Sequence, residues 1–277
     1  MHTMRLGIVT IPRGELPADG RSMTDHLMSF AQKAEALDFH GLWLTDAFAR
    51  GRPTLDPLSV MGLLCAVTKR IELGTCVIQV PIRHPVEHAH RVQTINLLSG
   101  GRFRFGVGTG STKNDFEAVQ ADFETRFKVL PGMIDVMRRT WNGEAVHGPA
   151  LTQWPGTEGG PQIMLGAWRS PRWINLAAKL DGWISSGIHS KWEDVEIGTR
   201  MYREAGGKRA IVANIFADFR PNPEGSPIGR PLTISLICTP AEARERLKRL
   251  ADTGVDDALI VCPFDDPSQL ETIRGLI

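Results

Sequence analysis

Residues 71–107, IELGTCVIQVPIRHPVEHAHRVQTINLLSGGRFRFGV, contain a complete strand–helix–strand unit. Residues 71–80 form a mostly apolar run, which predicts a buried strand. A helix is predicted to begin at Pro85, because proline fits the first helical position, and to end at the serine and two glycines of residues 99–101. Residues 103–107 then form a second apolar strand. Buried strands connected through helices are typical of a parallel sheet whose outer face is covered.

The same unit recurs along the chain. The predicted strands are residues 5–11, 42–45, 71–80, 103–107, 163–165, 183–184, 210–216 and 258–261. The clearest helical pattern, with apolar residues three and four positions apart, is carried by Phe123, Phe127, Leu130, Ile134, Met137 and Trp141. Residues 232–238 resemble a ninth strand, but no crossover helix precedes them, so we expect an accessory segment. Eight such units predict an α/β fold, a single (β/α)8 TIM barrel with short insertions, and an open doubly wound sheet is the alternative.

Length and charge agree with this fold. A barrel of eight units takes about 250 residues, so we expect residues 1–277 to form one domain. The 32 Lys and Arg side chains balance 31 Asp and Glu side chains, which gives no reason to expect nucleic acid or an anionic membrane as a partner. No segment approaches the ~20 apolar residues of a membrane helix or has the form of a signal peptide, so we expect a cytoplasmic protein.

The sequence offers no recognisable metal site. His88 and His90 are two positions apart on one predicted helix and therefore lie on different faces. The cysteines contain no C-x-x-C pair and are expected to be free thiols: Cys65, Cys76, Cys238 and Cys262.

Polar residues at the carboxyl ends of the predicted strands are the candidates for chemistry, because these ends meet at one mouth of a barrel. Asp46 ends the second strand, where its carboxylate can bind a ligand or accept hydrogen bonds from the turn. Residues 106–111 end the fourth strand. A dinucleotide fingerprint needs a further glycine where Ser111 or Lys113 stands, so these glycines predict close approach of a ligand to the backbone but no Rossmann site.

Two helix starts have both a functional and a structural interpretation. After the fifth strand, Arg169 and Ser170 precede a proline that begins a helix. Together with the free N–H groups of that helix they can bind a phosphate, or they can form a plain helix start. Arg83 and His84 also precede a helix-starting proline, and here an N-cap role for His84 is favoured over catalysis.

Three stretches occur in a specific order and spacing: residues 73–77 (LGTCV), 83–85 (RHP) and 98–110 (LSGGRFRFGVGTG). In these stretches the chain resembles the bacterial luciferase-like flavin-dependent oxidoreductases, a superfamily that includes luciferase-like monooxygenases and F420-dependent reductases. Further matching stretches are residues 41–46 (GLWLTD), 163–166 (IMLG), 170–171 (SP), 181–184 (DGWI) and 239–242 (TPAE).

The resemblance implies a TIM barrel that binds FMN, or alternatively coenzyme F420, at its mouth, and that reduces or oxygenates a small organic substrate. It implies a cis peptide at Cys76-Val77, a homodimer, and electrons from NAD(P)H or a flavin reductase. The cofactor-binding residues that it implies, Asp46 being also the best candidate for catalysis, are Asp46, Cys76, Val77, Thr109, Gly110, Ser111, Gly166, Ala167, Arg169 and Ser170.

Three departures from the family pattern bear on function. Ala47 stands where several F420-dependent members have a histidine, which favours FMN. Gly166 and Ala167 stand where many relatives have two glycines, and the bulky Trp168 follows them, which predicts a crowded entrance. Residues 218–230 are short and rich in Pro and Gly, which predicts a small lid. The alternative functions are a non-catalytic flavin-binding protein and a sugar-phosphate lyase or isomerase on the same barrel.

Overall fold

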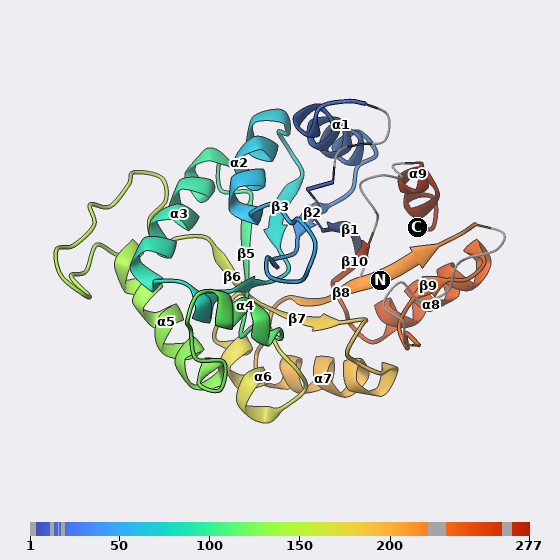
Figure 1. The fold of residues 1–277 in the computed structure, drawn as a ribbon. Coiled ribbons are helices and arrows are strands. Elements are labelled where there is room, and N and C mark those ends of the chain that lie inside the picture. Colours follow the sequence, from blue (N-terminus) through green and yellow to red (C-terminus); the bar gives the residue numbers. More distant parts are fainter. Residues whose placement is uncertain (1–3, 12–13, 16, 18–19, 221–230, 262–267) are drawn as a thin grey trace.

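Eight parallel strand positions close into a barrel, as predicted (Figure 1). The computed structural model describes residues 4–11, 14–15, 17, 20–220, 231–261 and 268–277. The barrel strands are β1 (Arg5–Thr10), β2 (Gly41–Leu44), β3 (Glu72–Thr75) continued by β4 (Ile78–Gln79), β5 (Phe103–Gly108), β6 (Gln162–Gly166), β7 (Gly182–Ser186), β8 (Ala210–Asp218) and β10 (Asp257–Val261). Strand β10 pairs with both β1 and β8, which closes the barrel.

Helices surround the strands as a ring in Figure 1. They are α1 (Met23–Ala36), α2 (Pro57–Val67), α3 (Pro85–Leu98), α5 (Arg126–Trp141), α6 (Pro171–Ala178), α7 (Trp192–Glu204), α8 (Pro240–Asp252) and α9 (Gln269–Arg274). The short helix α4 (Lys113–Ala118) lies inside this ring, close to the loop that follows β2.

Two details of the secondary structure differ from the prediction. The strand expected over residues 71–80 is interrupted between β3 and β4 and continues as a 3-10 turn, Val80–Ile82. The helix expected to include Phe123 begins only at Arg126. The Phe123 ring instead packs edge-on against Phe116 of α4, with the ring centroids 5.1 Å apart, so a tertiary contact takes this residue out of the helix.

The predicted accessory segment is confirmed. Strand β9 (Leu236–Ile237) pairs with residues 217 and 218 at the end of β8 and stands outside the barrel ladder. The predicted N-caps of α2, α3 and α8 are also found: Asp56, His84 and Thr239 each accept a hydrogen bond from the backbone N–H three residues on, and each precedes a proline.

One indole fills part of the barrel interior. Trp43 of β2 is fully buried, and a side chain at Gly41 or at Gly74 of β3 would collide with it. Trp43 belongs to a small inner core, which also includes Cys76, Met164, Ile184, Ala213 and Leu259. The larger core lies between the strands and the helices. The barrel interior is therefore packed and is not a pore.

A network of ion pairs closes the end of the barrel at which the strands begin. Arg209, just before β8, bonds to Glu72 and to Asp257, with N–O distances of 2.7 Å to each. Arg5 bonds to Asp257 at 2.8 Å, and Arg104 pairs with Glu72. Burial by itself would raise the pKa of Glu72, but hydrogen bonds from His40 and Arg209 and the charges of Arg209 and Arg104 hold that pKa well below its usual range.

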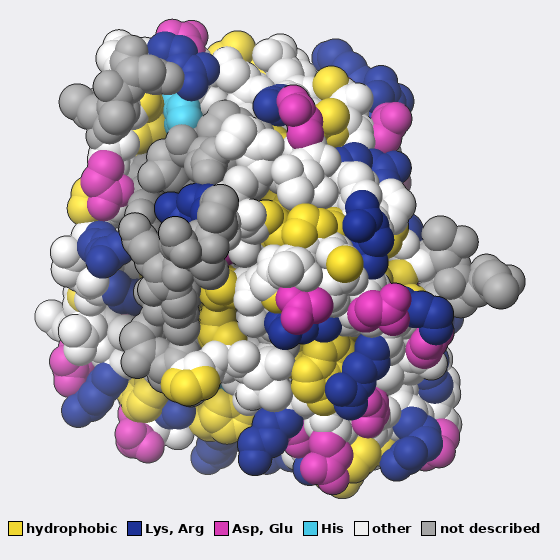
Figure 2. Space-filling model, turned by 90° about the vertical axis from the view of Figure 1, so that its right-hand side faces the viewer, with side chains coloured by type: hydrophobic (Ala, Val, Ile, Leu, Met, Phe, Trp, Pro, Cys, Tyr) yellow, Lys and Arg dark blue, Asp and Glu magenta, His cyan; other side chains and the backbone are white. Residues whose placement is uncertain are grey.

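Helix lengths and surface charge in the described part of the chain bear on contact with a membrane. None of the helices in the described part of the chain is long and apolar enough to cross a membrane. Figure 2 shows the face over α8 and α9, where Lys and Arg side chains are interspersed with Asp and Glu side chains. Residue Cys262 and most of the expected lid segment, residues 221–230, lie outside the described residues.

The ion network predicts a large effect of Arg209→Met on stability. This change leaves the carboxylates of Glu72 and Asp257 buried without their shared partner, so the free energy of unfolding should fall by about 3–5 kcal/mol. Urea denaturation measures it. The control is Arg70→Met, which removes an exposed pair with Asp38 and should cost under about 1 kcal/mol. Equal effects of the two changes would contradict the proposed importance of the network.

His88 predicts a second, pH-dependent effect. This side chain is 1% exposed beside Phe105, and burial together with the charges of Arg83 and Arg91 lowers its pKa to about 3, well below the 6.5 that is usual for histidine. Below pH 6.5 the unfolded chain binds a proton at His88 that the folded chain does not, so stability is lost as the pH falls toward 3. Between pH 7 and pH 4.5 the loss in free energy of unfolding should be roughly 2–3 kcal/mol larger in the wild type than in His88→Leu.

Urea denaturation at both pH values measures this difference. The control is His90→Gln, on the exposed face of the same helix. An equal loss of stability in the wild type and in His88→Leu would exclude this contribution.

Candidate functional site

A buried ion pair joins two segments at the mouth of the barrel. Asp46 follows β2, and Arg83 follows the 3-10 turn after β4. Arg83 Nη1 lies 2.7 Å from Asp46 Oδ2, and Arg83 Nη2 donates to Oδ1 at 3.0 Å. The backbone N–H of Gln79 donates to Oδ2 at 2.9 Å. Both carboxylate oxygens of Asp46 are thus engaged in holding the segment after β4.

A second buried carboxylate extends this network. Asp115 of α4 has a fully buried side chain. Its Oδ2 accepts from Gln79 Nε2 at 2.8 Å and from Arg50 Nη2 at 3.0 Å, and its Oδ1 accepts from the N–H of Ala49 at 2.9 Å. Burial alone would raise the pKa of Asp115, but the bonds from Gln79, Ala49 and Arg50 hold it below the usual value. Asp115 therefore ties the loop after β2 and the β4 segment to α4.

The sequence did not point to these partners. Asp115 lies in a helix of six residues, too short for an apolar pattern. For Arg83 the sequence favours a place in a helix start over catalysis, and it indicates no partner at Asp46. Gln79 did carry a usable signal, because it is a polar residue near the end of an otherwise mostly apolar strand. In the structure it is 2% exposed and bonded to both carboxyl-bearing segments.

The expected cis peptide is present at Cys76-Val77, between β3 and β4. The Val77 side chain occupies space that neighbouring strands leave free: a Cβ at Gly108 would lie 2.5 Å from Val77 Cγ2, and one at Gly166 would lie 2.8 Å from Cγ1. These two glycines therefore make room for the Val77 side chain. Burial raises the pKa of the Cys76 thiol to about 12, which leaves it neutral and unreactive at neutral pH.

Apolar side chains of the inner cluster form the floor of the mouth. They come from the barrel strands and from the segment between β3 and β4, and are Val9, Cys76, Val77, Ile184, Ala213, Phe216 and Val261. Such a floor can bind the face of a flat apolar ring system, since contact with it removes apolar surface from water.

The predicted phosphate loop follows β6 and leads into α6. Ser170 holds the N-cap position of α6, yet its hydroxyl makes no bond to the helix. Arg169 Nε donates to Asp194 Oδ1 at 3.1 Å, and both side chains are partly exposed. The carbonyl of Ala167 accepts from Trp183 Nε1 at 2.9 Å, while Trp168 is 68% exposed.

The strand neighbouring β6 brings the other predicted residues to the same edge. Val107 of β5 is in register with Leu165 of β6, so the segments after these strands leave the barrel side by side. Thr109 is partly buried, Ser111 is exposed, and Gly110 has a φ of +80°, which favours glycine. The structure thus brings the predicted cofactor residues to one end of the barrel. A ring-and-phosphate cofactor fits the apolar floor and the unused Ser170 hydroxyl.

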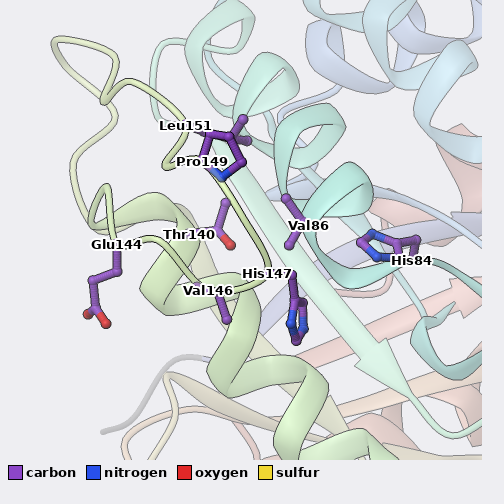
Figure 3. A pocket seen from close by; sticks show the side chains of 8 residues that line it. All are labelled: His84, Val86, Thr140, Glu144, Val146, His147, Pro149 and Leu151. Carbon is purple, nitrogen blue, oxygen red and sulfur yellow. The ribbon is translucent and has the colours of Figure 1, made fainter.

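A separate cavity lies outside the barrel, between the start of α3, the end of α5 and the loop after α5 (Figure 3). Its lining includes His84 and His147, whose ring centroids are 6.2 Å apart. Figure 3 shows Glu144 directed away from both histidines. Among the described residues no three His, Cys, Asp or Glu side chains are arranged to hold a metal ion. None of the predicted site residues lines this cavity.

Comparison with known proteins identifies a family to which the chain belongs and several solved structures with the same fold. Residues 4–225 match the model of the family described as luciferase-like monooxygenase. An uncharacterized protein of Mycobacterium tuberculosis is 26% identical over 221 residues, which cover 77% of this chain and 69% of that protein.

Solved structures match nearly the whole chain. The monooxygenase RslO1 from Streptomyces bottropensis gives a TM-score of 0.82 at 17% identity, covering 99% of this chain and 98% of that one. The coenzyme F420 dependent tetrahydromethanopterin reductase from Methanopyrus kandleri gives 0.76 at 16% identity, with the same coverage. The oxygenating constituent of 3,6-diketocamphane monooxygenase from Pseudomonas putida, in complex with FMN, gives 0.75 at 16% identity, again with 99% and 98% covered.

The packing of Val77 predicts a compensating pair of substitutions. Gly108→Ala places a methyl group against Val77 and should lower the free energy of unfolding by about 1–3 kcal/mol. Adding Val77→Ala should recover part of that loss, because it removes the colliding methyl groups. Thermal and urea unfolding measure both. Gly132→Ala, on α5 with open space around it, serves as control and should be neutral or slightly stabilising. Additive losses in the double variant would contradict this contact.

Proposed function

Because this chain belongs to the luciferase-like monooxygenase family, we propose that it is a flavin-dependent oxidoreductase that reduces or oxygenates a small organic substrate with reduced FMN. One observation carries the proposal: an apolar floor and an uncapped helix start lie at the same end of the barrel. These two features suit the two ends of FMN, a tricyclic ring and a phosphate. We infer a cytoplasmic homodimer that receives electrons from NAD(P)H or a flavin reductase.

The residues proposed to hold FMN divide into three groups. Asp46, Cys76 and Val77 lie at the floor, where the ring would bind. Thr109, Gly110 and Ser111 follow β5 and would hold the ribityl chain. The phosphate would be bound by the segment after β6, namely Gly166, Ala167, Arg169 and Ser170.

The side chains of Arg169 and Ser170 have donors that the described part of the protein does not use. The Ser170 hydroxyl is not used by α6, and the first N–H groups of a helix lack partners within it. Arg169 uses Nε for Asp194, and its two terminal nitrogens remain as donors for a phosphate. The positive end of the α6 dipole adds to the attraction of an anion.

FMN, when bound, supplies the hydride or the reaction with oxygen, and the protein contributes position and environment. The Asp46 carboxylate is held by Arg83 and by the Gln79 N–H, an arrangement that supports a role in fixing the backbone under the ring. The buried apolar floor limits water beneath the ring.

FMN is preferred over F420 because Ala47 takes the place of a histidine that several F420-dependent relatives carry. The structural relatives include both kinds: the diketocamphane monooxygenase in complex with FMN and the F420 dependent reductase from Methanopyrus kandleri. F420 is therefore the alternative cofactor to be tested beside FMN.

Titration with FMN, riboflavin and F420 tests the proposed function. We expect FMN to bind with a change in its absorbance spectrum, and the double change Arg169→Gln with Ser170→Ala to weaken FMN binding at least tenfold. Riboflavin lacks the phosphate, so the double change should leave riboflavin binding unaltered. Arg200→Gln, which removes an equal charge from the exposed part of α7, is the control. Binding of neither FMN nor F420 would overturn the proposal.

A further inference from the structure

An exposed aromatic side chain sits on a firmly held loop at the mouth. Phe48 follows Asp46 by two residues and is 41% exposed. The next two residues, Ala49 and Arg50, are both bonded to the fully buried carboxylate of Asp115. A loop held on a buried charge is more ordered than a free surface loop. Phe48 is therefore partly exposed to solvent on a loop that hydrogen bonds to Asp115 hold in place.

Exposed apolar side chains recur on other loops of the same end of the barrel. Val119, at the end of α4, is 44% exposed, and Trp168, after β6, is 68% exposed. We call Phe48, Val119 and Trp168 the apolar rim. The strands that lead to these segments, β2, β5 and β6, are parallel, so the segments extend from one end of the barrel. The rim therefore belongs to the same end as the apolar floor.

Charged side chains that flank the rim are paired with each other. Asp46 pairs with Arg83 and Arg50 with Asp115. Arg169 pairs with Asp194, beside Trp168. A charged group of a substrate at the rim would have to break one of these pairs or lie against apolar surface, and both cost free energy.

We propose that Phe48 is a specificity-determining residue that binds the apolar part of an uncharged aromatic or aliphatic substrate, and that Asp115 is the positioning residue that holds it. The inference rests on the proposed function, since it takes the barrel mouth as the active site. The occupant is a small molecule because the rim lies at the same end of the barrel as the apolar floor, which the proposed function assigns to the flavin ring.

Binding of two naphthalenes of matched shape tests the inference. 2-Acetonaphthone is neutral and 2-naphthoate is an anion, and calorimetry measures their affinities for the full chain with and without FMN. We expect the neutral ketone to bind at least tenfold more tightly than the carboxylate. Phe48→Ser should weaken ketone binding about tenfold. Leu98→Ser, at an equally apolar but distant position that is 57% exposed, should not change it.

A double-mutant cycle tests the positioning role of Asp115. Asp115→Asn should weaken ketone binding several-fold when Phe48 is present and have no further effect in the Phe48→Ser background, because its contribution passes through Phe48. A general structural role would weaken binding equally in both backgrounds. If Asp115→Asn fails to fold, Phe48→Ser alone still decides whether Phe48 contacts the ligand.

The outcomes separate this inference from the proposed function. Normal FMN binding with equal affinity for the two naphthalenes, or with no effect of Phe48→Ser, overturns the inference alone. A shift of oligomeric state in Phe48→Ser by analytical ultracentrifugation, with ketone binding unchanged, would make the rim a contact between copies of the chain and also overturns it. Absence of FMN and F420 binding overturns the proposed function, while ketone binding without cofactor is still measured.

Discussion

The ion pair between Asp46 and Arg83 fixes how the mouth of this barrel is built. It connects the end of β2 to the residue after the 3-10 turn, and the Gln79 N–H joins the same carboxylate. A buried pair of this kind contributes little net stability compared with an apolar contact, but it is costly to separate. Its effect is therefore on geometry: the backbone from Cys76 to Arg83 has one well-defined position beside β2.

Gln79 connects this ion pair to a second buried carboxylate. Its side chain carries the connection to Asp115, and Asp115 in turn holds the loop after β2. This arrangement also depends on large side chains lying over glycines of the barrel strands. Gly108 and Gly166 lack side chains where Val77 extends across them, just as Gly41 and Gly74 make room for Trp43. The side chains of Trp43 and Val77 therefore fill the space that these glycines leave free, and the inside of the barrel stays packed and apolar.

Local patterns in the sequence were sufficient for the fold. Strand runs, helix caps such as Asp56 and Thr239, and the turn at residues 99–101 each depend on neighbours within a few positions. The structure has the caps and the turn where they are predicted, and among the strand runs it interrupts the one over residues 71–80. Asp115 could not be found in this way, because its partners Ala49, Arg50 and Gln79 are 36 to 66 residues away. Phe123 lies outside α5 for a different reason: its ring packs against Phe116 of the preceding helix α4, a contact that the apolar spacing of a single helix does not reveal. The cis peptide was expected from the family resemblance alone, because no local preference of Cys76 and Val77 indicates it.

Because the net charge of the protein is close to zero, an anion at this mouth would have to be attracted by individual nearby groups and not by the overall charge. The large charge network of the protein lies at the opposite end, where Arg209 and its partners neutralise one another. At the mouth, Arg169 is bonded to Asp194, and Asp194 also accepts the N–H of Lys191 at the start of α7. A phosphate bound as proposed would therefore share Arg169 with a carboxylate that α7 holds in place. That competition lowers affinity for any small anion, but a ligand that also covers the apolar floor gains free energy from the burial of its ring. The arrangement consequently favours a ligand that carries ring and phosphate together over either part alone.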